Sequence, residues 1–177
     1  DRHETTSTTT AVLERALTGG ILMGALLKVG QRVAVKFEGN GPVQKVIVEA
    51  DAYGKICGYV MNPAVDLPLV YGKPNIVDAL GELGLLSVVK DIKMQVMPEG
   101  VVPLLTSTFD GDLTYYLNHS EQTPSLVVIG EVLADNGRLL VSGGVLIQAM
   151  PPNDVSIIRD FIERMQELPP LEVLLKE

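Results

Sequence analysis

Few side chains in this sequence could carry out acid–base or nucleophilic chemistry. His3 and His119 are its two imidazoles, and nucleophilic catalysis needs a base beside the nucleophile. His119, Ser120 and Glu121 are consecutive, whereas side chains share a helix face when they are three or four residues apart. We interpret this run as the end of a helix. An enzyme with a pocket near His119, using His119 or Tyr115 as acid or base, remains an alternative.

The acidic pairs have a simpler explanation than catalysis. Asp110 and Asp112 are close enough in sequence to act together, as are Glu163 and Glu167. Either aspartate can also cap a helix over Leu113–Ser120, and glutamates four residues apart fit a solvated helix face. We therefore assign these carboxylates to helix capping and to solvent.

The single cysteine and the glycines do not indicate a metal or nucleotide site. Cys57 lies in an apolar strand pattern and is predicted to be a buried, inert thiol. One cysteine excludes an intrachain disulfide or a multi-cysteine zinc site within these residues. The string Gly39-Asn40-Gly41 begins like a dinucleotide fingerprint, but Gln44 replaces the final glycine and a strand follows, which predicts a turn. We predict no catalytic, cofactor-binding or metal-binding residue in this chain.

The charge balance argues against two classes of partner. The 177 residues carry 14 Lys and Arg against 22 Asp and Glu, which gives a net charge of −8 and a pI near 4.8. Such a protein is repelled by phosphate backbones and anionic membranes, so nucleic acid and membranes are not expected partners. The most apolar stretch, Ala16–Leu27, is shorter than the roughly 20 residues that cross a bilayer. With no export signal and one thiol, a cytoplasmic protein is expected.

The first half of the chain predicts a helix followed by an antiparallel meander. The apolar residues of Ala11–Lys28 recur at helical spacing after a Ser/Thr run that can supply capping oxygens. Three glycines weaken this helix, so packing against a neighbour, such as a close strand, must hold it. Residues 32–38 alternate apolar and polar side chains, and with Val43–Ala50 and Ile56–Met61 they predict three antiparallel strands.

The second half mixes short helices with strands. We expect an irregular connection over 65–74, a helix from an Asn75 cap to Leu83, strands over Leu85–Met94 and Val101–Leu105, the helix Leu113–Ser120, a hairpin of Leu126–Leu133 with Leu139–Met150, and an amphipathic helix over Asp154–Leu168. With 46% apolar residues, one globular domain is expected. Hairpins with interposed helices indicate an α+β fold in which antiparallel hairpins and a meander pack with helices, rather than a doubly wound parallel sheet.

Five strings in register resemble one protein family. The string DLTYYLNHSEQTPS at 112–125 resembles the hallmark of the redox-regulated heat-shock holdase family of about 33 kDa. The other strings occur in the family's order: EGNGPV at 38–43, GYVMNP at 58–63 with VDLP at 65–68, LSVVKD at 86–91, and GGVLIQAMP at 143–151. Together they span nearly the whole chain and resemble the family's amino-terminal substrate-binding domain.

The resemblance implies an ATP-independent chaperone that binds unfolding client proteins after oxidative stress, often as a homodimer. Residues 1–177 are expected to be one substrate-binding domain, truncated at its amino terminus. Family members end in a module that holds zinc through a Cys-x-Cys and a Cys-x-x-Cys pair, and Cys57 matches none of these ligands. Zinc and redox control are therefore expected in the parent protein, and no cofactor is expected in this chain.

A holdase needs exposed apolar surface rather than reactive groups. Binding a client at about micromolar affinity asks for on the order of 500–900 Å² of apolar burial. We expect a groove continued across a dimer, or a sheet face that a regulatory module normally covers. Flexible thioethers suit adaptable surfaces, so the candidate client-binding residues are Met94, Met97, Leu104, Leu105 and Met150. A purely structural dimerisation domain is a second alternative, which a large self-complementary interface would indicate.

Overall fold

The computed structural model describes residues 5–92, 95–96, 100–134, 139–150 and 155–176. The helices are α1 (Ser7–Ala25), α2 (Ile76–Leu80), α3 (Phe109–His119), α4 (Val155–Glu167) and α5 (Leu171–Leu174). The strands are β1 (Arg32–Gly39), β2 (Lys45–Asp51), β3 (Ile56–Val60), β4 (Gly84–Ile92), β5 (Gln95–Val96), β6 (Gly100–Pro103), β7 (Ser125–Leu133) and β8 (Leu139–Gln148).

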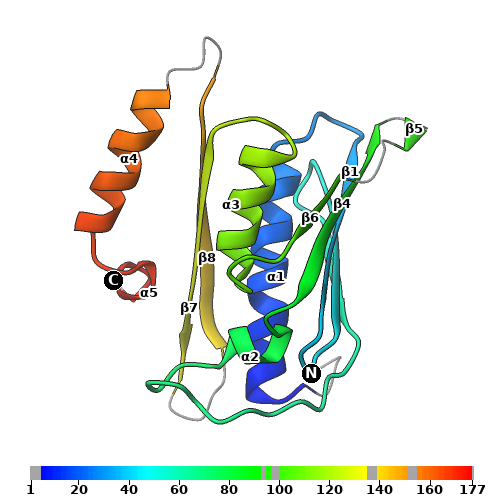
Figure 1. Cartoon of the computed structure of the whole chain (residues 1–177), viewed down its shortest axis with the longest axis vertical. Helices are drawn as coiled ribbons and strands as arrows, with labels where there is room; N and C mark the ends of the chain where they lie inside the picture. The colour runs from blue at the N-terminus through cyan, green and yellow to red at the C-terminus, as the bar shows by residue number, and fades with distance from the viewer. Residues whose placement is uncertain (1–4, 93–94, 97–99, 135–138, 151–154, 177) are drawn as a thin grey trace.

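Two antiparallel sheets enclose a layer of helices. The six-stranded sheet has the order β3-β2-β1-β4-β5, and β6 also pairs with β4. The hairpin β7–β8 forms a separate two-stranded sheet. Figure 1 shows α1 and α3 between the two sheets, with α4 and α5 on the far side of the hairpin. The α+β class, the three-stranded meander and the last hairpin are confirmed.

Helix α1 lies at the centre of the molecule and is held by close strand packing, as its glycines predict. Gly20 packs so tightly against Val48 and Ile56 that an added methyl group would lie 3.0 Å from each side chain. At Gly24 the same methyl group would lie 2.9 Å from the backbone oxygen of Asp51. The helix starts earlier than predicted because Thr6 and its partner in a capping box satisfy the first turn.

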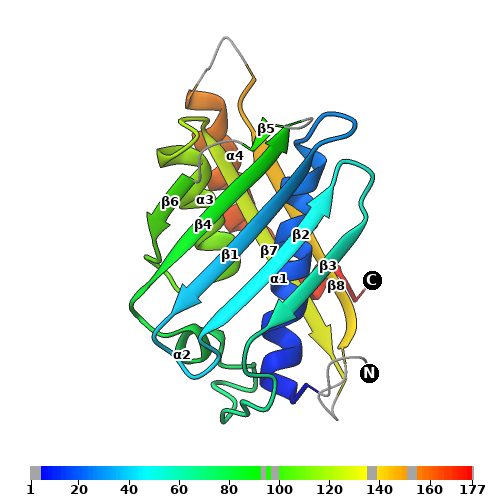
Figure 2. The same ribbon diagram turned by 90° about the vertical axis from the view of Figure 1, so that its right-hand side faces the viewer.

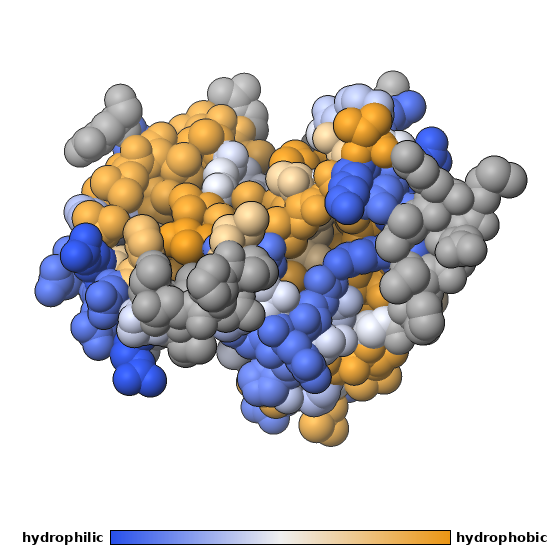
Figure 3. Space-filling view, turned by 90° about the horizontal axis from the view of Figure 1, so that it is seen from above, coloured by the Kyte–Doolittle hydropathy of each residue, from blue (hydrophilic) through white to orange (hydrophobic). Residues whose placement is uncertain are grey.

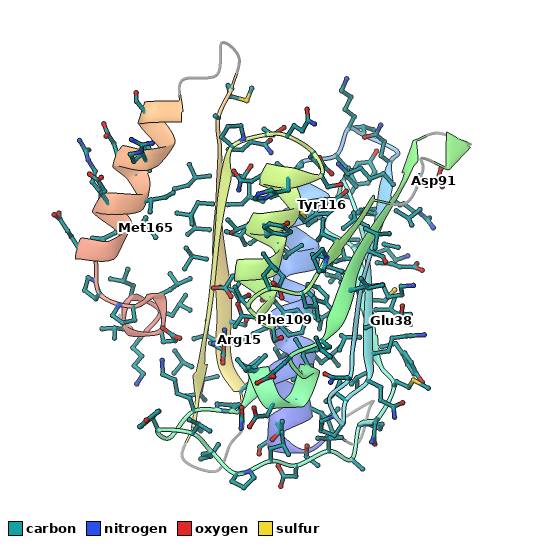
Figure 4. All side chains as sticks on the ribbon, in the orientation of Figure 1. Arg15, Glu38, Asp91, Phe109, Tyr116 and Met165 are labelled. Carbon is teal, nitrogen blue, oxygen red and sulfur yellow. The ribbon has the colours of Figure 1, made fainter. Side chains whose placement is uncertain are left out.

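The core lies between the six-stranded sheet and the helices. Alternate residues of β1, namely Val33, Val35 and Phe37, are buried, and the Phe37 ring meets Phe109 of α3 edge-on at 4.6 Å between centroids. This contact explains why α3 begins at Phe109, four residues before the predicted start: a fully buried aromatic side chain belongs to its first turn. Figure 4 shows Phe109 between the layers.

The prediction that Asp110 or Asp112 caps α3 is wrong. The cap is Thr108, whose side chain accepts the Gly111 N–H. Asp112 is fully buried, and its Oδ1 accepts the N–H groups of Leu105 and Thr106 at 2.8 and 2.9 Å. Asp112 therefore ties the loop after β6 to the first turn of α3.

We expect Asp112→Ala to lower the free energy of unfolding by about 2–4 kcal/mol, because it removes a buried carboxylate and leaves the partly buried N–H groups of Leu105 and Thr106 without their acceptor. Asp112→Asn keeps an acceptor oxygen and should lose clearly less. Asp110→Ala, in the same turn, should change stability by no more than about 0.5 kcal/mol. Urea unfolding measures all three variants. Equal losses for the alanine variants at 110 and 112 would contradict the role given to Asp112.

The remaining predicted elements occur with shifted ends. Asn75 caps a helix that ends at Leu80, since Gly81 follows with φ of +88°. The turn at Gly39-Asn40-Gly41 is confirmed: Gly41 N–H donates to the Leu80 carbonyl at 2.8 Å, a close approach that leaves no space for a side chain at Gly41. Helices α4 and α5 end the described chain, and α5 was not predicted, because four residues carry too little periodicity.

An ionic cluster joins α1, β7 and α5. Arg15 of α1 contacts Glu131 of β7 at 2.5 Å and Glu172 of α5 at 3.8 Å, and Lys73 reaches Glu172 at 3.4 Å. Glu131 is buried, and burial raises the pKa of its carboxyl more than the neighbouring Arg15 lowers it. The cluster places the end of the described chain against the hairpin.

Candidate functional site

The outer face of the six-stranded sheet faces away from the described helices. Odd-numbered residues of β4 and β6 and even-numbered residues of β1 point to this face, because their neighbours along each strand are buried against the helices. Figure 2 shows β3, β2, β1 and β4 side by side, with the described helices behind them. Within the described residues, no helix or strand lies over this face.

One end of this face carries a group of apolar side chains on β4 and β6. The register places Leu85 opposite Pro103 and Ser87 opposite Val101. Pairing continues one residue beyond the strands, where Leu104 N–H donates to the Gly84 carbonyl at 2.9 Å. Leu83 and Leu105 follow directly and are well exposed. We call the residues Leu83, Leu85, Val101, Pro103 and Leu105 the β4–β6 apolar cluster.

A second apolar group lies on β2 and β3 at the other end of the face. Ile47 of β2 pairs with Tyr59 of β3, and Glu49 pairs with Cys57. Tyr59 and Met61 are about half exposed, and Cys57 is exposed as well. These residues leave apolar surface beside the free edge of the sheet.

Charged side chains separate the two apolar groups. Glu38 of β1 contacts Lys36 at 2.9 Å and Lys45 of β2 at 2.7 Å. Hydrogen bonds from Lys36 and Lys45 lower the pKa of the Glu38 carboxyl, so it stays ionised. In Figure 4, Glu38 and Asp91 project from the sheet on the side away from the helices. The face can thus offer apolar contacts on both sides of a solvated centre of ion-paired side chains.

The predicted client-binding residues occupy different environments. Leu105 is 60% exposed within the β4–β6 apolar cluster, and Met150, just after β8, is 77% exposed. Leu104 is only 5% exposed, because its side chain points inward and packs under Gly84, so it belongs to the core. Met94 and Met97 lie outside the described residues.

Exposed apolar residues also occur on the opposite side of the molecule. Leu140 and Val145 of β8, Met150 and Phe161 of α4 are each more than a third exposed. Figure 3 shows hydrophobic surface on this side when the molecule is seen from above. Helices α4 and α5 lie beside this hairpin and contact β7, so part of its outer side is covered.

The prediction of a buried Cys57 is wrong, since this thiol is exposed. The cause is the position of β3 at the edge of the sheet, where Cys57 points to the uncovered outer face. One thiol cannot supply the ligand set of a structural zinc site. Among the described residues, no group of three or more His, Cys, Asp and Glu side chains is arranged to hold a metal ion.

His119 does not have the surroundings of a catalytic base. Its side chain is exposed at the end of α3, with Nδ1 3.1 Å from the Tyr115 carbonyl oxygen. Its ring packs on the Tyr115 ring at 4.0 Å between centroids. These two contacts are local to one helix turn and bring no nucleophile to the imidazole. The enzyme alternative therefore gains no support from this geometry.

Comparisons with known proteins identify the family of this chain. The Hsp33 protein family model matches residues 1–177. The chain belongs to the Hsp33 family. Relatives of this Hsp33 chain named 33 kDa chaperonin include one from Geobacter sulfurreducens, 49% identical over 175 residues, and one from Bacillus cereus, 40% identical over 177 residues. Each alignment covers 99% of the chain.

A solved Hsp33 structure has the same fold. The crystal structure of the 33 kDa chaperonin from Thermotoga maritima superposes with a TM-score of 0.91 at 32% identity and covers 99% of this chain. The Hsp33 chain described here spans 58% and 61% of the Geobacter and Bacillus relatives and 61% of the Thermotoga chain. No helix in the described part combines the length and the apolarity needed to cross a membrane.

Proposed function

We propose that this chain acts as an ATP-independent holdase, which binds unfolding proteins and keeps them from aggregating. The observation that carries the proposal is the uncovered outer face of the six-stranded sheet, with its β4–β6 apolar cluster. A protein that binds the unfolded and not the folded form of a client withdraws it from aggregation by mass action. No side chain has to perform chemistry in this scheme.

The composition of the face suits many clients. Its apolar groups lie on several strands, so a client can make contact in more than one arrangement. The ion-paired group of Lys36, Glu38 and Lys45 limits the contiguous apolar area and helps to keep the protein in solution. The net charge of −8 opposes nonspecific aggregation of the protein.

Control of this face belongs to the same proposal. In the parent protein we infer that a zinc-binding module covers the face and that oxidation releases it. A cytoplasmic location and a homodimeric state also remain predictions from the sequence. The named relatives are chaperonins of 33 kDa, which favours a chaperone over an enzyme.

The experiment is to heat a labile enzyme, such as malate dehydrogenase, with and without this chain and to follow light scattering. An equimolar amount of the chain should suppress most of the scattering in the absence of ATP. Scattering that is unchanged by the chain would contradict the proposal. Sedimentation of the chain alone tests the alternative of a purely structural dimer, which predicts tight self-association without suppression.

A further inference from the structure

The free edge of β3 lacks the features that usually protect a strand edge. β3 is the outermost strand of the six-stranded sheet (Figure 2). Its residues Ile56–Val60 read ICGYV and include no charged residue and no proline. Proteins commonly guard an edge with lysine, proline or a bulge, because unpaired N–H and C=O groups invite another strand. This edge is therefore open to pairing.

The direction of the backbone bonds identifies the available groups. Asp51 N–H donates to the Lys55 carbonyl at 3.0 Å, and Met61 N–H donates to the Lys45 carbonyl at 2.9 Å. The N–H and C=O groups of the odd-numbered residues of β3 thus bond to β2. In an antiparallel ladder, the N–H and C=O groups of the even-numbered residues between them point away from β2. In the described part of the chain, no backbone hydrogen bond outside the sheet is made by the outward-pointing residues Ile56, Gly58 and Val60.

Helix α1 presents an exposed apolar side chain beside this edge. Gly20 of α1 packs against Ile56, and on the other side Leu22 packs against Gly144 of β8. Ile21 lies between Gly20, which faces β3, and Leu22, which faces β8, and its side chain is 43% exposed. A strand added to β3 would therefore place its inward side chains over Ile21.

Charge and size favour a client segment over a second copy as the occupant. Each copy carries a net charge of −8, which opposes the pairing of two β3 edges, whereas a neutral or basic client segment does not meet this repulsion. Stable dimers bury at least about 1,200 Å². An edge of five residues is about 17 Å long and cannot supply that area alone. Short, reversible pairing fits it better.

We propose that extended segments of unfolded clients add to the six-stranded sheet as an antiparallel strand along β3. This inference rests on the proposed holdase function and names one way in which the client is held. Backbone hydrogen bonds are the same for every sequence, so strand addition gives affinity without sequence selection. The apolar surface of Tyr59 and Ile21 then lies on the two sides of the added strand.

Amide hydrogen exchange, measured residue by residue, tests whether the outward-pointing N–H groups of β3 form hydrogen bonds with a client. The probe is ribonuclease A that has been reduced and alkylated with iodoacetamide, which stays unfolded and is basic. On adding it to the full chain, exchange at Ile56, Gly58 and Val60 should slow by about tenfold or more. The amides of Cys57 and Tyr59 already bond to β2 and should change far less.

Cys57 offers a second test of the same geometry. Because its backbone bonds to β2, it would form a non-hydrogen-bonded pair with an added strand, at about 4.5 Å between Cα atoms, which suits a disulfide. In an extended peptide of alternating valine and threonine, an activated cysteine replaces either one threonine or one valine. Cross-linking to Cys57 should be about tenfold faster from threonine positions, which share its outer face. The control variant Cys57→Ser/Tyr53→Cys, in the exposed turn before β3, should show no such alternation.

The outcomes separate this inference from the proposed function. Slowed exchange at the three outward amides together with alternating cross-links supports strand addition. Suppression of client scattering without slowed exchange overturns strand addition and leaves the holdase function standing. Exchange that is already slow in the protein alone shows that the chain or a second copy occupies the edge, and this also overturns the inference. Loss of suppression itself overturns the holdase function.

Discussion

Replacing Leu85 and Val101 together by lysine should remove most of the protein's capacity to keep an unfolding client in solution. Both side chains are about half exposed in the β4–β6 apolar cluster. Fully burying a side chain of this size contributes about 1.5–3 kcal/mol, and about half of that remains to be gained by a side chain that is already half buried. Losing both contacts therefore weakens client binding by about 10- to 100-fold, since each 1.4 kcal/mol is a factor of ten.

The fold should tolerate these lysines. Leu85 lies opposite Glu38 across β1 and β4 and is about half exposed, so a lysine there can keep its ammonium group in solvent. Val101 lies opposite Ser87, which leaves space for a solvated chain. Circular dichroism and urea unfolding of the double variant should therefore match the unmodified protein to within about 1 kcal/mol.

The matched control is Val29→Lys/Tyr53→Lys, which adds the same charge and removes exposed apolar side chains away from the sheet face. Light scattering of the heated client should show suppression by the control and little or none by the Leu85→Lys/Val101→Lys protein. Equal suppression by both would place the client surface elsewhere. Equal loss in both would make net charge the cause.

Local sequence patterns were sufficient for most of the fold. Helix α1 and the strands of the meander follow from periodicity and turn residues, which act over a few positions. The start of α3 did not follow, because it is set by the contact of Phe109 with Phe37, more than seventy positions earlier in the chain. Likewise the burial of Asp112 depends on the loop that folds back over it.

The candidate site was predicted less well, because exposure depends on which strands lie at an edge. The apolar pattern around Cys57 is typical of a buried strand, yet β3 ends the sheet and its outer face is open. Leu104 and Leu105 are equally apolar, but the alternation of the strand sends one into the core and the other to the cluster. Leu85, Val101 and Leu105 all have odd numbers, and odd-numbered side chains of β4 and β6 point outward. This shared alternation was the signal that could have predicted the whole cluster.

Arg15→Met should lower the free energy of unfolding by about 3 kcal/mol at pH 7. Arg15 is the partner of the buried Glu131, and removing one member of such a pair leaves a charge without compensation. The exposed Arg159 of α4 provides the control, because Arg159→Met changes the same charge and should cost less than about 0.5 kcal/mol. Chemical unfolding at pH 7 measures both variants.

The loss should depend on pH in a direction that the pKa of Glu131 fixes. Burial already raises the pKa of this carboxyl above 4.5, and removing Arg15 raises it further, because Arg15 lowers it in the unmodified protein. A carboxyl with a higher pKa in the folded state than in the unfolded state destabilises the fold while it is ionised. This penalty is full above the raised pKa and is relieved as the pH falls toward 4.5. The deficit of Arg15→Met should therefore shrink between pH 7 and pH 5.

The double variant Arg15→Met/Glu131→Leu separates charge from packing. With both members of the pair replaced by apolar side chains of similar size, no buried charge remains, and most of the stability at pH 7 should return. Its difference from the unmodified protein should also vary less with pH than that of Arg15→Met. If Arg15→Met loses the same stability at pH 5 as at pH 7, and the second substitution restores none, the contribution of Arg15 is the packing of its side chain between α1 and β7 rather than its charge.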